Sequence, residues 1–198
     1  MFFYMVRSVM LCAGFAVLVS ATIATSSTAR ADDTRLHVEL DPLPFLLGGY
    51  GVQLGVAPGP LPGWRFGLGN FSLDVPDFAA QRNSDNDGFH IHVRRSHALY
   101  GLHFFSDLRG WCVGGSVRYL RLEYTHDNTP DERARIGELS VEAIGGYKWH
   151  PTKAGFYVMP WLAIALPLAS SDTATVGDAT YEADFVQVFA TANIGWQF

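Results

Sequence analysis

A serine followed directly by a histidine, Ser96-His97, is the first feature of the sequence that could do chemistry. A hydrolase needs a nucleophile, a base that activates it and an acid that orients the base. Adjacent residues of a strand point to opposite faces unless a bulge intervenes, so these two side chains are not expected to meet. A lipase-type Gly-x-Ser-x-Gly elbow is also absent, because the segment 114–118 reads Gly-Gly-Ser-Val-Arg and lacks the final glycine.

Two neighbouring segments contain the kinds of residues that bind metals. His90 and His92 lie two positions apart, so on a strand they share one face and could bind a metal with a third ligand such as His97. Residues 83–88 read Asn-Ser-Asp-Asn-Asp-Gly, which matches the first half of a calcium loop, but Arg94 stands where the bidentate glutamate is needed. We expect exposed histidines and a flexible acidic turn, and whether that turn binds calcium stays open.

Charged and polar side chains recur on one face of the extended segments. They are His37, Glu39, Asp41, Gln53, Arg65, His97, Arg118, Glu142, Lys148, Gln187 and Asn193. If this face lines a small barrel, the charges need partners, and we expect a structural network of the arginines and Lys148 with Glu39, Asp41 and Glu142. We therefore assign no catalytic residue, no cofactor-binding residue and no metal ligand.

The closing segment, Ala183 to Phe198, best shows how such side chains would be positioned. Seven residues alternate on one apolar face, namely Val186, Val188, Ala190, Ala192, Ile194, Trp196 and Phe198. The other face is mostly polar, with Phe185 and Phe189 as large exceptions. A strand with an apolar outside, a polar inside and an aromatic end is what a transmembrane β-barrel requires.

Seven further segments alternate in the same way. The eight predicted strands are Arg35–Asp41, Gly49–Ala57, Gly63–Val75, Phe89–Phe105, Trp111–Tyr124, Gly137–Trp149, Phe156–Leu168 and Ala183–Phe198. The apolar phase slips near Gly69-Asn70 and again near Arg95-Ser96, and each slip predicts a β-bulge. Pro160 cannot donate a ladder hydrogen bond, so it predicts a bulge or a partner carbonyl left unpaired.

Eight strands place both ends of the barrel chain on the periplasmic side. The turns on that side are then Pro58–Gly63, Ser106–Gly110 and His150–Ala154, while Pro42–Gly48, Asp77–Gly88, His126–Arg135 and Ser170–Glu182 face outwards. Short inner turns and longer outer loops are typical of membrane barrels. An aromatic girdle is predicted near the periplasmic ends, formed by Trp64, Phe104, Trp111, Tyr147, Trp149, Phe156, Trp196 and Phe198.

The amino-terminal residues 1–31 have the parts of a secretory signal peptide. Arg7 precedes an apolar stretch, and Ala29-Arg30-Ala31 is a small-x-small cleavage site. The alternative is a permanent anchor, because Ser8 to Ala29 carries no charge. Residues 32–198, the predicted barrel domain, hold 12 basic and 19 acidic residues, and this acidic balance argues against nucleic-acid binding. Cys112 is their only cysteine, so it is expected to be a small packing residue.

The signal region and the ending Ile194-Gly195-Trp196-Gln197-Phe198 resemble those of small OmpA-, OmpX- and OmpW-like outer-membrane barrels. The resemblance implies an all-β fold, an eight-stranded antiparallel up-and-down transmembrane barrel, in the outer membrane. It also implies a structural or envelope role without catalysis, contact with lipids including lipopolysaccharide, and folding by the barrel assembly machinery. We further expect a monomer. The alternatives are a lipid A- or phospholipid-modifying hydrolase, a narrow channel or carrier for a small apolar ligand, and a soluble lipocalin-like barrel.

Overall fold

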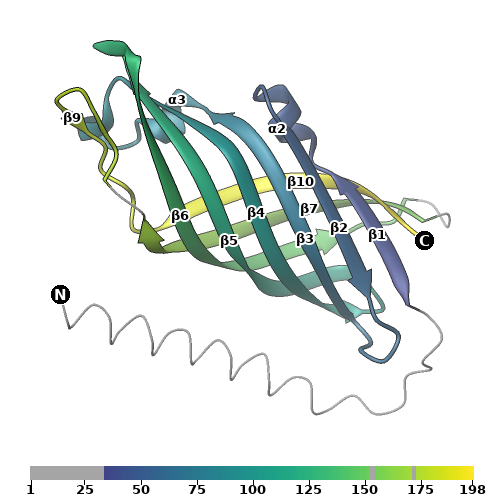
Figure 1. Cartoon of the computed structure of the whole chain (residues 1–198). Coiled ribbons are helices and arrows are strands. Elements are labelled where there is room, and N and C mark those ends of the chain that lie inside the picture. The colour runs from purple at the N-terminus through teal and green to yellow at the C-terminus, as the bar shows by residue number, and fades with distance from the viewer. Residues whose placement is uncertain (1–33, 152–154, 171–172) are drawn as a thin grey trace, which may run out of the picture.

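Eight antiparallel strands close into a barrel in this computed structural model, which describes residues 34–151, 155–170 and 173–198 (Figure 1). The order around the ring is β1, β10, β7, β6, β5, β4, β3, β2. Their bounds are β1 Arg35–Leu40, β2 Tyr50–Ala57, β3 Trp64–Val75, β4 Phe89–Ser106, β5 Arg109–His126, β6 Thr129–Lys148, β7 Phe156–Ser170 and β10 Gln187–Gln197. The predicted architecture is confirmed, while the predicted signal peptide at 1–31 lies outside the described residues.

The connections at the two ends of the barrel differ as expected. The end predicted to face outwards, named the outer end, carries the helices α2 (Pro42–Leu46) and α3 (Asp77–Ala80), the 3-10 turn η1 (Ser84–Asn86) and the small hairpin of β8 (Thr175–Val176) and β9 (Ala179–Thr180). The other end carries the short turns at Pro58–Gly63 and Ser106–Gly110 and the carboxy-terminus, while residues 152–154 of the third predicted turn lie outside the described residues. None of the described helices is long or apolar enough to cross a membrane.

The faces of the barrel are polar inside and apolar outside. Exposed apolar side chains lie on every strand of the ring, including Leu36, Leu54, Leu68, Leu99, Val117, Tyr147, Leu162 and Val188. Buried charged side chains lie on the inner face, including Glu39, Arg65, Arg118, Glu142 and Lys148. A soluble barrel has the opposite arrangement, so the lipocalin-like alternative is wrong.

The outer ends of β4, β5 and β6 reverse this polarity. There the inner face is an apolar cluster of Phe89, Ile91, Val93, Leu120, Leu122, Tyr124 and Ile136, covered by Ala174 and Val176 of the β8–β9 segment. The outer face bears charges such as Arg94 and Arg135. The reversal explains why β6 begins at Thr129 and not at the predicted Gly137, because the charged residues of this segment are the solvent face of a strand. β10, in contrast, begins four residues after the predicted Ala183.

One of the two predicted bulges is present. The register of β4 against both β3 and β5 shifts around Arg94, close to the predicted slip at Arg95-Ser96. The bulge predicted near Gly69-Asn70 is wrong, since β3 pairs regularly with β2 and β4 through these positions. Leu68 faces outwards, whereas Phe71 lines the interior. The apolar residues change from the outer to the inner face because β3 leaves the apolar outer belt between these two positions.

The last strand closes the ring through main-chain hydrogen bonds. β10 pairs with β1 from Ile194 opposite Leu40 to Gln197 opposite His37, and the amide of Phe198 donates to the Leu36 carbonyl at 2.9 Å. Pro160 lies opposite Ala192 without a bulge. On its other side the ladder with β6 stops after Gly146 and resumes as a single bridge at Trp149, which fits the prediction of an unsatisfied rung beside Pro160.

Candidate functional site in the barrel interior

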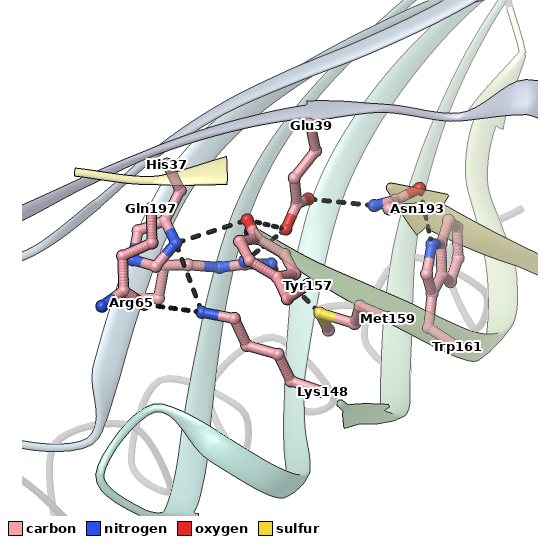
Figure 2. A network of polar contacts seen from close by, with 9 residues as sticks. All are labelled: His37, Glu39, Arg65, Lys148, Tyr157, Met159, Trp161, Asn193 and Gln197. Carbon is pink, nitrogen blue, oxygen red and sulfur yellow. Dashed lines mark hydrogen bonds and ion pairs between the residues drawn. The ribbon is translucent and has the colours of Figure 1, made fainter. Parts of the chain in front are cut away.

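A network of polar contacts lies inside the barrel, in the half away from α2 and α3 (Figure 2). At its centre the Arg65 guanidinium of β3 pairs with the Glu39 carboxylate of β1, and both side chains are 1% exposed. The Tyr157 hydroxyl donates to Glu39 at 2.7 Å, and the Asn193 amide donates to its other oxygen at 2.9 Å. Four strands that are distant in sequence therefore meet on one carboxylate. Alternation places each of these side chains inside, because each occupies the inward parity of its strand.

Lys148 extends the network towards the end of the barrel that carries the carboxy-terminus. Its ammonium donates to the Gln197 side-chain oxygen at 2.9 Å and lies 3.4 Å from His37 Nδ1. It also lies 4.0 Å from the centre of the Tyr157 ring, a cation–π contact. No described carboxylate lies within ion-pair distance of Lys148, so its partners are the Gln197 and His37 side chains and an aromatic face.

A second buried pair, Arg118 and Glu142, lies further towards the outer end. Arg118 Nη1 is 2.9 Å from Glu142 Oε1, and the Ser116 hydroxyl donates to the same carboxylate. The guanidinium carbon lies 5.0 Å from the Phe71 ring centre and 5.3 Å from that of Phe189. The pair is thus enclosed between two aromatic rings.

The predicted network is only partly right. Arg65 with Glu39 and Arg118 with Glu142 pair as expected, but Lys148 has the partners given above. Asp41 joins neither pair. It caps α2 by accepting from the Leu43 amide at 3.0 Å, and it accepts from the Thr191 hydroxyl at 2.7 Å. His97 does not belong to the interior at all, because it is exposed on the outer face after the Arg94 bulge.

A cavity of about 520 Å³ lies above the network, towards the outer end. Its walls are mainly apolar, and its rim is formed by α2, through residues such as Leu43 and Pro44, and by α3, through Phe78 and Ala79. Four buried polar atoms on lining residues have no hydrogen-bond partner among the described residues, namely Arg65 Nε, Arg118 Nε, the Tyr100 hydroxyl and Glu142 Oε1, the last of which is ion-paired with Arg118 Nη1. The cavity can therefore take a small, largely apolar molecule.

Ser96 and His97 point to opposite faces of β4. The Ser96 side chain is fully buried, and its hydroxyl has no hydrogen-bond partner among the described residues. His97 is exposed outside, with Nδ1 3.0 Å from the Asn70 amide nitrogen. The pair therefore lacks the contact between nucleophile and base that a hydrolase needs.

The other histidines contact carboxylates on the outer surface. His90 lies 2.9 Å from Asp127 and 3.0 Å from Asp77, and the hydrogen bonds to these carboxylates, that to Asp127 first, raise its pKa. His92 lies 2.5 Å from Asp74. No group of three potential metal ligands gathers among the residues described.

The acidic turn at 83–88 folds as the short η1 helix and is fixed to the segment before β10. Asn86 is buried, and its side chain donates to the Glu182 carbonyl at 2.9 Å and accepts from the Glu182 amide at 2.8 Å. Asn83 accepts from the Asp85 amide. The side-chain oxygens of Asn83 and Asn86 are thus already hydrogen-bonded within the chain.

The aromatic girdle is present with one correction. Trp111, Tyr147, Trp149, Trp196 and Phe198 are exposed, and Trp64 and Phe156 are half-buried. Phe104 is 2% exposed and lies in the interior beside buried Cys112, the packing environment expected for that cysteine. Its inward position follows from β4's alternation below the bulge, which turns Phe105 outwards instead.

Sequence reasoning missed the roles of the aromatic side chains inside the barrel. Tyr157, Met159 and Trp161 share the inward face of β7, where Tyr157 and Met159 contact Arg65 and the Trp161 indole N–H donates to Asn193. The sequence contains one indication of this role. The side chains with polar or polarisable groups stand at alternate positions of an otherwise apolar strand. For the rim helices α2 and α3, the sequence offers only a proline and an aspartate near each helix start as evidence of a helix.

No protein-family model matches the chain, and no curated protein matches it. Solved structures do. The N-terminal β-barrel domain of OprF from Pseudomonas aeruginosa is 12% identical, with a TM-score of 0.52 over 86% of this chain and all of that one. A major outer membrane protein from Thermus thermophilus is 14% identical, with a TM-score of 0.45 over 84% of this chain and all of that one. Neisserial surface protein A (NspA) is 9% identical, with a TM-score of 0.45 over 86% and 98%.

Proposed function

The chain has the fold of small outer-membrane β-barrels, and we propose that it resides in the outer membrane as a sealed barrel with a structural role in the envelope and no catalysis. The observation that carries the proposal is the network around Glu39 and Arg65, whose side chains are 1% exposed. Tyr157 and Met159 close the same layer and are equally buried. An eight-stranded barrel filled in this way leaves no water-filled path. Insertion by the barrel assembly machinery as a monomer belongs to the same proposal.

Conductance in planar lipid bilayers tests the seal. We expect the purified protein to give no conductance steps, because the buried layer around Glu39 blocks ion passage. A large open porin added afterwards to the same membrane serves as the positive control. Reproducible steps from the protein alone would contradict a sealed interior.

A second candidate function is favoured by the cavity above the network. Its size and its apolar walls suit a small apolar molecule. Such a molecule would enter from the outer end between α2 and α3 and stop at the sealed layer. The protein would then hold its ligand without transporting it across the membrane.

Filling the cavity tests this second function. Gly69 lines the cavity, and a Cβ built there meets only ordinary contacts of 3.6 Å or more, so a Gly69→Leu side chain can occupy the space. We expect it to weaken binding of 1-anilinonaphthalene-8-sulfonate, measured by fluorescence in lipid nanodiscs against empty discs, by at least about tenfold. Gly145→Leu on the lipid-facing side, where nothing lies within 4 Å, is the matched control. Equal binding by both variants would contradict a ligand site in the cavity.

A further inference from the structure

Arginines gather on the outer face of β4, β5 and β6, just beyond the apolar belt. Leu99 and Val117 are paired across β4 and β5 and belong to the belt, with 60% and 47% of their surface exposed. The next outward-facing pair is His97 with Tyr119, and the pair after that is Arg95 with Arg121. Two residues along a strand span about 7 Å, so the arginine pair lies about one such step beyond the Tyr119 ring position.

Three more arginines adjoin this pair and share one carboxylate. Glu123 lies 2.6 Å from Arg94, 3.0 Å from Arg133 and 2.8 Å from Arg135. These contacts, with the Arg135 hydrogen bond as the largest cause, lower the pKa of Glu123 to about 2, so it stays ionised. The three arginine side chains remain 48% to 66% exposed. One carboxylate cannot satisfy three guanidinium groups, and donors are left facing outwards.

Arg95 and Arg121 have no such compensation. They stand directly opposite each other on adjacent strands, and neither lies within ion-pair distance of a described carboxylate. Like charges in this position destabilise a sheet. The nearest acidic side chain on β3, Asp74, contacts His92 instead. Within an acidic chain, five arginines around one glutamate form a local excess of positive charge that the fold itself does not need.

We propose that these five arginines, Arg94, Arg95, Arg121, Arg133 and Arg135, form a docking site for the phosphorylated headgroup of an outer-leaflet lipid. Exposed guanidinium forks match phosphate oxygens in a bidentate manner. The apolar belt below, at Leu99 and Val117, provides the surface along which the acyl chains of the same molecule would lie. A phosphate at Arg95 and Arg121 would also relieve the repulsion between them. The site rests on the proposed location in the outer membrane.

The test compares lipid binding by two double variants. Arg95→Gln/Arg121→Gln removes the uncompensated pair, and Arg82→Gln/Arg109→Gln removes two exposed arginines elsewhere as the matched control. Each protein is placed in phosphatidylcholine nanodiscs, and its binding of diphosphorylated lipid A is measured by native mass spectrometry beside enzymatically dephosphorylated lipid A and inorganic phosphate. We expect the first variant to bind lipid A at least about tenfold more weakly than the wild type, and the control to bind it unchanged.

Three results would overturn the site. One is equal binding of lipid A by the wild type and by Arg95→Gln/Arg121→Gln. Another is equal binding of phosphorylated and dephosphorylated lipid A, which would show that the belt alone retains lipid. The third is saturation of the arginine site by inorganic phosphate alone, which would show a simple anion site and not a lipid site. The variant is expected to fold, since losing a like-charge pair does not destabilise the sheet, and failure to enter nanodiscs would instead count against the proposed membrane location.

Discussion

An Arg65→Met variant is expected to lose about 3–5 kcal/mol of unfolding free energy, the usual cost of removing one partner of a buried ion pair. Glu39, which is 1% exposed, would be left in the barrel interior without its charged partner. Only the Tyr157 hydroxyl and the Asn193 amide would still donate to the carboxylate. Two neutral donors do not replace the charge of a guanidinium, so the loss is expected to be large.

Urea unfolding in lipid vesicles, followed by tryptophan fluorescence, measures the effect. Adding Glu39→Gln to Arg65→Met removes the stranded charge and is expected to recover part of the stability. Arg82→Met is the surface control, because its pair with Asp184 is 62% and 38% exposed and is expected to matter by less than about 1 kcal/mol. If Arg65→Met unfolded within about 1 kcal/mol of the wild type, the network would not stabilise the fold.

The strand pattern of the barrel was predictable because one physical rule governs most of it. Along most of each strand, the side chains alternate between an apolar outer face and the lumen, and β10 and β7 show this alternation with almost no exception. The parity of eight strands then fixed which connections lie at each end, as the structure confirms. The inward position of most of the polar residues, including Glu39, Arg65, Arg118 and Lys148, followed from the same rule.

The rule fails where the strands leave the apolar belt. At the outer ends of β4 to β6 the core lies inside and water outside, so apolar residues such as Ile91 and Ile136 change sides. If apolar side chains are assumed to face outwards along the whole of β3, Phe71 requires a bulge, and the structure has none there. The charged start of β6 looked like a loop for the same reason.

The partners of the interior charges could not be predicted from alternation. Alternation gives the face of a residue but not its height relative to strands across the barrel. Whether Lys148 meets a carboxylate depends on the stagger of all eight strands, and here it meets Gln197 and the Tyr157 ring. The cavity depends in addition on α2 and α3, whose placement over the outer end is decided by contacts such as the Asp41 cap.

The central claim is that the chain spans the outer membrane with the β5–β6 hairpin outside and the β4–β5 turn inside. Single cysteines at two exposed positions test it, Asn128→Cys beyond β5 and Ser106→Cys at the end of β4. Native Cys112 is 1% exposed and gives little background. With a membrane-impermeant maleimide on intact cells, we predict that Asn128→Cys is labelled and that Ser106→Cys is labelled only after the outer membrane is permeabilised. Labelling of both positions in intact cells, or the reverse order, would contradict a spanning barrel in this orientation.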